Sequence, residues 1–176
     1  MGASGWEYSV PYQDDIAAAL ERLRVETYER GGYYKAEPDP SLQLSEDEFK
    51  ATLKLDDDPD GIQNFLLEEW HKAKKRPAAV DADTLLASQP DSGTHSIIDI
   101  CDGLSEHPCL FTASPLTAEQ HLEIFGTDRP SRPAVLEWIS KHDIGHIRAR
   151  WEAAYVVSYS AAGSPERIHF VGFSGD

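Results

Sequence analysis

The 176-residue sequence has few basic residues and no long apolar run. It carries 16 Lys and Arg against 31 Asp and Glu, which gives a formal net charge of -15. Attraction to phosphate is the main affinity term in nucleic-acid binding, so this composition argues against a general nucleic-acid-binding protein. No stretch approaches the roughly 18 apolar residues that a membrane helix needs, and we predict no membrane association.

Cysteine is also scarce. Cys101 and Cys109 are the two cysteines, too few for a disulfide framework. The N-terminus shows no basic segment followed by an apolar one, the pattern of a secretory signal. We therefore predict a cytoplasmic protein with reduced thiols. Glycine-rich dinucleotide and phosphate-binding motifs are missing as well, and the sequence predicts no cofactor.

The length fits one domain, and the pattern predicts a flexible leader over residues 1–5 and a single α+β domain over residues 6–176. Alternation and capping signals predict helices and strands in turn. The expected helices cover about 15–30, 46–54, 61–76, 81–88, 117–126 and 133–142. The expected strands cover 6–10, 95–100, 151–159 and 167–173, with an irregular segment over 101–115. We expect the helices to pack on a small antiparallel sheet that ends in a C-terminal β-hairpin.

Helical spacing predicts the buried faces of two helices. In the helix over 61–76, the apolar residues Ile62, Phe65, Leu66 and Ala73 are expected to face inward. In the helix over 133–142, Val135, Leu136 and Ile139 are expected to be buried.

Negative charge is concentrated in residues 37–69, where eleven acids and two lysines give a net charge of -9. One interpretation is a solvated surface that keeps the protein soluble. The other is an acidic face that binds a basic partner. The residues we assign to such a face are Glu46, Asp47, Glu48, Asp56, Asp57, Asp58 and Asp60.

The segment from Asp56 to Gly61 also resembles the start of a calcium-binding EF-hand loop. That loop needs a closing bidentate glutamate at its twelfth position. Leu67 occupies this position and Glu68 comes one residue late. We therefore do not predict a calcium site.

Three candidate soft ligands, Cys101, His107 and Cys109, lie within nine residues. Structural zinc sites usually have two cysteines two to four residues apart, whereas seven residues separate these two. A fourth ligand would have to come from elsewhere, with His121, His142 and His146 as candidates. Unrelated cysteines and histidines are the simpler interpretation, so we predict no metal. Either thiol is also a candidate nucleophile if a histidine lies nearby in space.

Five arginines lie in the second half of the chain: Arg129, Arg132, Arg148, Arg150 and Arg167. Arginine recognises oxyanions well, so a ligand pocket near Arg129–Trp151 is one hypothesis. Salt bridges to the acidic first half are the more ordinary use.

Three segments resemble small uncharacterised proteins of actinobacteria. They are Gly93–Ile100, Phe125–Pro130 and the ending Ile168–Asp176. Together they cover 23 of the 176 residues. The resemblance implies a bacterial cytoplasmic origin and assigns no activity or site residues.

Two functions follow as hypotheses. The first is a non-enzymatic, immunity-like interaction module whose acidic face at 37–69 binds a basic protein partner. The alternative is a small enzyme or ligand-binding protein, with its pocket near Arg129–Trp151 or a Cys/His site at Cys101–Cys109. The sequence favours the first, and it does not indicate an oligomeric state.

Overall fold

The computed structural model describes residues 4–53, 61–141 and 144–174. The chain forms two compact units, residues 36–78 and residues 1–35 with 79–176. We name them the helical unit and the sheet unit. The described residues form six α-helices and a four-stranded sheet, so the α+β class is confirmed. In that part of the chain, no helix combines the length and the apolar character needed to cross a bilayer.

The sheet has the strand order β1-β4-β3-β2. Its strands are β1 (Gly5–Pro11), β2 (Ala113–Pro115), β3 (Ala153–Tyr159) and β4 (Pro165–Phe173). The pairs β1–β4 and β3–β4 are antiparallel, which confirms the predicted C-terminal hairpin. The short β2 pairs in parallel with β3, so the sheet is mixed. A parallel neighbour requires a crossover, here made by α5 (Ala118–Phe125) and α6 (Arg132–Lys141).

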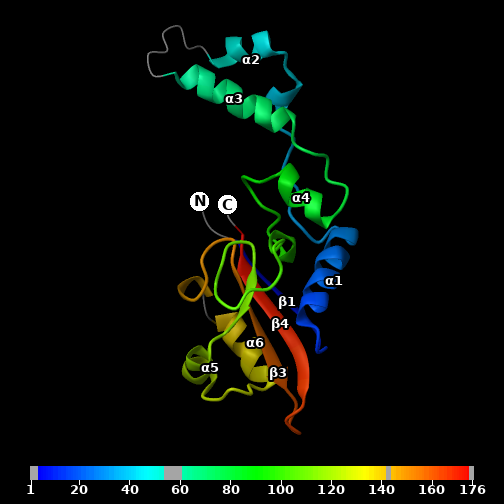
Figure 1. Ribbon diagram of the computed structural model, residues 1–176, viewed down its shortest axis with the longest axis vertical. Coiled ribbons are helices and arrows are strands. Elements are labelled where there is room, and N and C mark those ends of the chain that lie inside the picture. The colour runs from blue at the N-terminus through cyan, green and yellow to red at the C-terminus, as the bar shows by residue number, and fades with distance from the viewer. Residues whose placement is uncertain (1–3, 54–60, 142–143, 175–176) are drawn as a thin grey trace. The chain divides into compact units, whose positions relative to one another are not determined.

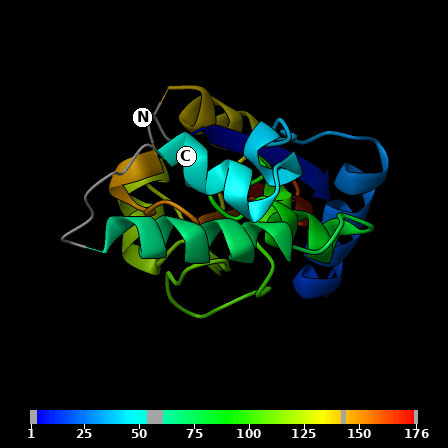
Figure 2. The ribbon, with the colours of Figure 1, turned by 90° about the horizontal axis from the view of Figure 1, so that it is seen from above.

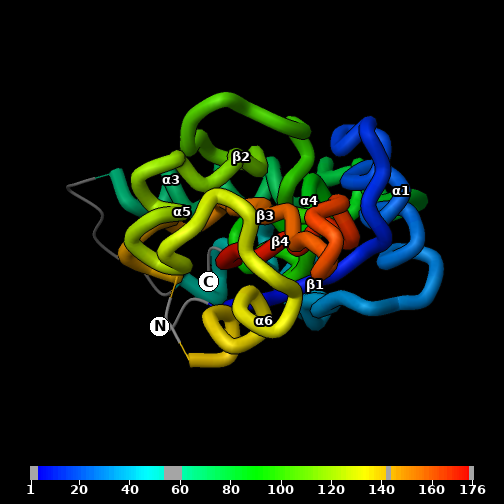
Figure 3. The backbone as a smooth tube through the Cα atoms, turned by 90° about the horizontal axis from the view of Figure 1, so that it is seen from below, coloured from blue at the N-terminus to red at the C-terminus, as the bar shows by residue number. Residues whose placement is uncertain are grey.

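Alternating side chains give the sheet two apolar faces. On one face, Ile168 and Phe170 pack against Leu20 and Leu23 of α1 (Ile16–Glu29). On the other face, Val171 packs in a cluster with residues of α6. The sheet therefore lies between helices (Figure 1), and Figure 3 shows α6 next to β1.

Local capping signals account for the helix starts. The Asp15 carboxylate accepts the Ala18 N–H at the start of α1, and Asp81 caps α4 (Ala82–Ser88) in the same way. Thr117 and Gln120 form a reciprocal capping box at α5, as their spacing predicts. All three helices were predicted from these signals.

The helical unit consists of η1 (Pro40–Gln43), α2 (Glu46–Leu53) and α3 (Ile62–Lys74). The two α-helices lie side by side in Figures 1 and 2. Trp70 is the buried side chain of α3. Its ring stacks on Phe49 of α2 with 4.8 Å between centroids, and its Nε1–H donates to the Ser41 carbonyl oxygen at 2.9 Å. A single tryptophan thus joins all three elements.

The predicted strand over 95–100 is wrong. Ile97–Asp99 form a 3-10 turn, η2, which begins where the Ser96 hydroxyl accepts the Ile98 N–H. His95 has a φ of 51°, a left-handed conformation that interrupts an extended chain. The three isoleucines of this segment, Ile97, Ile98 and Ile100, are all buried, which explains why the segment has the composition of a strand.

Two predicted apolar faces also need correction. Leu136 is 40% exposed, whereas Val135, Trp138 and the partly buried Ile139 pack in the cluster on the sheet. In α3, Ile62 and Phe65 are 49% and 61% exposed. Phe49 of α2 contacts α3 at Trp70, whereas Ile62 and Phe65 lie nearer the N-terminus of α3.

Candidate functional site

The acidic residues of the helical unit begin at the first turn of α2. Glu46, Asp47 and Glu48 occupy this turn and are exposed. Acids are favoured there because the N-terminus of a helix carries partial positive charge. The remaining acids of the predicted face, Asp56, Asp57, Asp58 and Asp60, lie outside the described residues.

Part of this charge is balanced inside the unit. The Glu46 carboxylate accepts a hydrogen bond from Lys50 at 2.5 Å and lies 3.3 Å from His71 Nε2. The hydrogen bond from Lys50 lowers the pKa of Glu46. Glu48 accepts both the N–H and the hydroxyl of Ser45, and these bonds lower its pKa. Glu46 and Glu48 therefore also serve the structure of the unit itself.

The exposed apolar residues of α3 are the feature that sequence reasoning placed in the core. Ile62 and Phe65 are three residues apart and share one face of the helix. Glu68 and Glu69 follow Phe65 by three and four residues, so they lie one turn further along. The result is an exposed phenyl ring bordered by carboxylates, on the helix that follows the aspartate segment in sequence.

The Cys/His hypothesis receives no geometric support. Within the described ranges, no three or more His, Cys, Asp or Glu side chains form a group able to hold a metal ion. Both cysteines are free thiols, Cys101 partly buried and Cys109 exposed. Burial, and then the nearby Asp102, raise the pKa of the Cys101 thiol. A raised pKa disfavours the thiolate, which is the reactive form.

The residues near Arg129–Trp151 contribute to structure. The Arg129 guanidinium lies 5.7 Å from the centre of the Tyr159 ring. The Arg148 side chain is buried and donates to four backbone carbonyl oxygens, those of Ser114, Pro115, Ile147 and Ala153. Arg148 thereby ties the end of β2 to the start of β3, so its charge is used within the fold.

Sequence reasoning missed a buried polar network around Asp99. Its carboxylate accepts the Ser174 hydroxyl at 2.6 Å and the Thr94 N–H at 2.7 Å. All three residues are fully buried. Burial raises the pKa of Asp99, while the two hydrogen bonds act in the opposite direction. The network joins η2 to Ser174, the residue after β4, and its burial marks it as structural.

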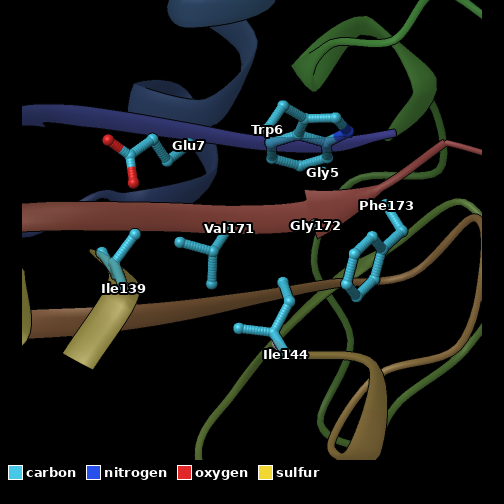
Figure 4. Close-up of a pocket in the computed structure, with 8 residues that line it drawn as sticks. All are labelled: Gly5, Trp6, Glu7, Ile139, Ile144, Val171, Gly172 and Phe173. Carbon is cyan, nitrogen blue, oxygen red and sulfur yellow. The ribbon is translucent and has the colours of Figure 1, made fainter. Parts of the chain in front are cut away.

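Sequence reasoning also missed a groove between β1 and α6. Its larger cavity has a volume of about 340 Å³ and is lined by Gly5, Trp6, Glu7, Ile139, Ile144, Val171, Gly172 and Phe173. In Figure 4 Ile139, Ile144 and Val171 gather on one side of β4, and the Trp6 ring lies on the other. A smaller cavity of about 60 Å³ includes Ser9 and His169, and it shares Glu7 and Ile139 with the larger one.

His169, which lines the smaller cavity, is fully buried. Its Nε2 atom lies 3.0 Å from the Ser158 hydroxyl oxygen. Among the described residues, its Nδ1 atom has no hydrogen-bond partner. Burial, with Arg167 and Arg132 nearby, lowers its pKa to about 4, so the ring is neutral near pH 7. The alternation of polar residues in β1 and β4 (Glu7 and Ser9, Arg167 and His169) is the sequence signal that indicates this face.

No family model, curated protein or solved structure matches the chain.

Proposed function

We propose that this protein is a non-enzymatic, immunity-like binding module whose helical unit binds a basic protein partner. The observation that carries the proposal is the exposure of Phe65 and Ile62 on α3, in a segment of the sequence, residues 37–69, that is rich in acids. Aromatic side chains are enriched in protein interfaces, whose rim is polar, and a few central residues carry most of the binding energy. The partner surface that fits it is a basic rim around an apolar pocket.

The two parts of this surface have different roles. Exposed carboxylates accelerate the encounter with a cationic partner and make the association depend on salt. The phenyl ring of Phe65 loses its exposed area on binding, and burial of a large aromatic side chain stabilises a complex by about 1.5–3 kcal/mol. Asp47 and Glu68 extend the acidic surface along α2 and α3. Glu46 and Glu48 contribute less, since their carboxylates have partners within the unit.

Affinity capture from a bacterial lysate tests the proposal with matched charge variants. The test variant carries Asp56→Asn, Asp57→Asn, Asp58→Asn and Asp60→Asn. The control carries Glu29→Gln, Glu106→Gln, Glu119→Gln and Glu166→Gln, four exposed acids of the sheet unit. Both variants gain the same charge. We expect the wild type and the control to retain a basic protein at low salt, and the test variant to lose it.

The proposal is contradicted if the captured protein is not basic, if it is retained equally by the test variant, or if its retention does not depend on salt. The proposal is also contradicted if no captured protein is retained by the control and lost by the test variant.

A further inference from the structure

The outer edge of β1 carries backbone groups that no other strand uses within the described chain. β1 is the terminal strand of the sheet and pairs with β4 alone. The Tyr12 N–H donates to the Glu166 carbonyl oxygen, and the Ser174 N–H donates to the Ser4 carbonyl oxygen. These bonds fix the alternation of an antiparallel ladder, in which even-numbered residues of β1 bond to β4. The N–H and C=O groups of Gly5, Glu7 and Ser9 therefore point toward the free edge.

One of these groups already has a partner. The Ser9 carbonyl oxygen accepts a hydrogen bond from Arg167 Nη2 at 2.7 Å, and the Ser9 hydroxyl accepts one from Arg167 Nε. The proline at position 11, which has no N–H, ends the strand. The usable edge thus runs from Gly5 to the N–H of Ser9.

The two cavities follow each other along β1 at a spacing of two residues. The larger one includes Gly5 and Glu7, and the smaller one includes Glu7 and Ser9. Residues i and i+2 of a strand face the same side and are about 6.6 Å apart. An added strand therefore directs alternate side chains at both cavities. Gly5 has no side chain, and a Cβ at this position would lie 3.4 Å from the Phe173 ring, so this ring forms the wall of the larger cavity beside Gly5.

The chemical character of the groove also changes from one outward-facing residue of β1 to the next. The larger cavity has apolar walls, including Val171, Ile139 and Phe173. Glu7, exposed and common to both cavities, places a carboxylate in the middle. At the Ser9 end the nearby charges are cationic, from Arg167 and Arg132. The sequence of environments is apolar, anionic and cationic.

We propose that β1 accepts an extended peptide segment of a partner protein as an added antiparallel strand, with a large apolar residue opposite Gly5, Lys or Arg opposite Glu7, and Asp or Glu opposite Ser9. Backbone hydrogen bonds supply affinity in this mode, and pockets for alternate side chains supply specificity. In the peptide's own N-to-C direction the pattern is acidic, any, basic, any, apolar. This surface belongs to the sheet unit and does not depend on the proposed role of the helical unit.

A second copy of the chain fits this edge less well. Antiparallel pairing of two β1 strands about Glu7 places the two Glu7 carboxylates directly opposite each other. Like charges at directly opposed positions destabilise a sheet. The charge pattern therefore favours a different chain as the occupant.

Synthetic peptides test the inference on the full-length protein. The first probe has an acetyl-Glu-Thr-Lys-Thr-Leu-amide core, and the second reverses the order of Glu and Lys. We expect the first probe to perturb the NMR amide signals of Gly5, Glu7 and Ser9 and to bind at least tenfold more tightly than the second. With Glu7→Lys this preference is expected to fall at least tenfold, whereas Glu119→Lys on the exposed α5 leaves it unchanged.

N-methylation separates strand addition from simple charge attraction. A methyl group on the Lys nitrogen removes the bond to the Glu7 carbonyl oxygen and is expected to reduce binding at least tenfold. A methyl group on either Thr nitrogen points away from β1 and leaves binding within about threefold. The inference is overturned if the β1 amides do not respond, if all methylated probes bind alike, or if the protein alone forms a dimer through β1. None of these outcomes changes capture by the helical unit.

Discussion

His169 Nε2 lies 3.0 Å from Ser158 Oγ on the neighbouring strand, and both side chains are fully buried on the α6 face of the sheet. The pair is a polar contact on the face of the sheet that also carries the apolar cluster of Val156, Val171 and residues of α6. Burial without a compensating charge disfavours the protonated imidazole, which makes this contact sensitive to acid.

Acid is therefore expected to weaken the fold through His169. Its pKa is about 4 in the folded protein, against 6.5 as its ordinary value. The unfolded chain binds a proton at this residue below about pH 6.5 and the folded protein does not, so stability falls as the pH decreases through this window. We expect the loss in unfolding free energy between pH 7 and pH 4.5 to be about 2 kcal/mol smaller in His169→Gln than in the wild type. Urea unfolding at both pH values measures it, and equal losses in the two proteins would disprove this assignment.

Gly93 and Gly103 provide a matched test of the contact between Gly93 and Trp151. Both glycines have positive φ, 67° and 77°. A Cβ at Gly93 would lie 2.7 Å from Trp151 Cη2, whereas a Cβ at Gly103 meets nothing within 4 Å. Gly103→Ala should cost about 1–2 kcal/mol from backbone strain, and Gly93→Ala about 1–3 kcal/mol more from overpacking. Thermal unfolding compares them, and equal costs would show that the ring does not constrain the loop.

The two cysteines should differ in reactivity toward a thiol reagent. Cys109 is exposed, whereas burial raises the pKa of the partly buried Cys101. The thiolate is the nucleophile, so we expect Cys101 to react about tenfold more slowly near pH 8. The single variants Cys101→Ser and Cys109→Ser isolate each rate in a disulfide-exchange assay. Faster reaction at Cys101 would revive its role as a candidate nucleophile.

Substitution of Trp70 should destabilise the protein far more than substitution of Phe65. Trp70 is buried and contacts Phe49 and Ser41, so Trp70→Ala should destabilise the helical unit by about 3–5 kcal/mol. Phe65 is exposed, and Phe65→Ala should change stability by no more than about 0.5 kcal/mol. Circular dichroism during urea unfolding provides the measurement. A large loss from Phe65→Ala would place this ring in a core and remove it from the proposed binding surface.

Local signals made most of the elements predictable. Asp15, Asp81 and the Thr117–Gln120 pair each start a helix through a side-chain bond to a backbone N–H within three residues. The C-terminal hairpin was predictable from alternation on both sides of a glycine-containing turn. Such features depend on a few consecutive residues, which a single sequence displays directly.

Features that depend on distant residues were not predictable. His95 follows Thr94, whose N–H donates to Asp99, and Asp99 also accepts the hydroxyl of Ser174, 75 residues away. Helical periodicity identified an apolar face on α3 but not how much of it another element covers, so Phe65 was placed in the core. The β1–α6 groove was missed for the same reason, because its walls come from segments far apart in the sequence, β1, α6 and β4.

The dependence of association on salt tests the central claim most directly. The captured partner is purified, and its association and dissociation rates with the wild type, the four-aspartate variant and Phe65→Ala are measured over a range of salt concentrations. We expect the wild-type association rate to fall as salt rises, the aspartate variant to associate more slowly with a weaker salt dependence, and Phe65→Ala mainly to dissociate faster. Rates that are independent of salt and unchanged in both variants would contradict a binding role for the helical unit.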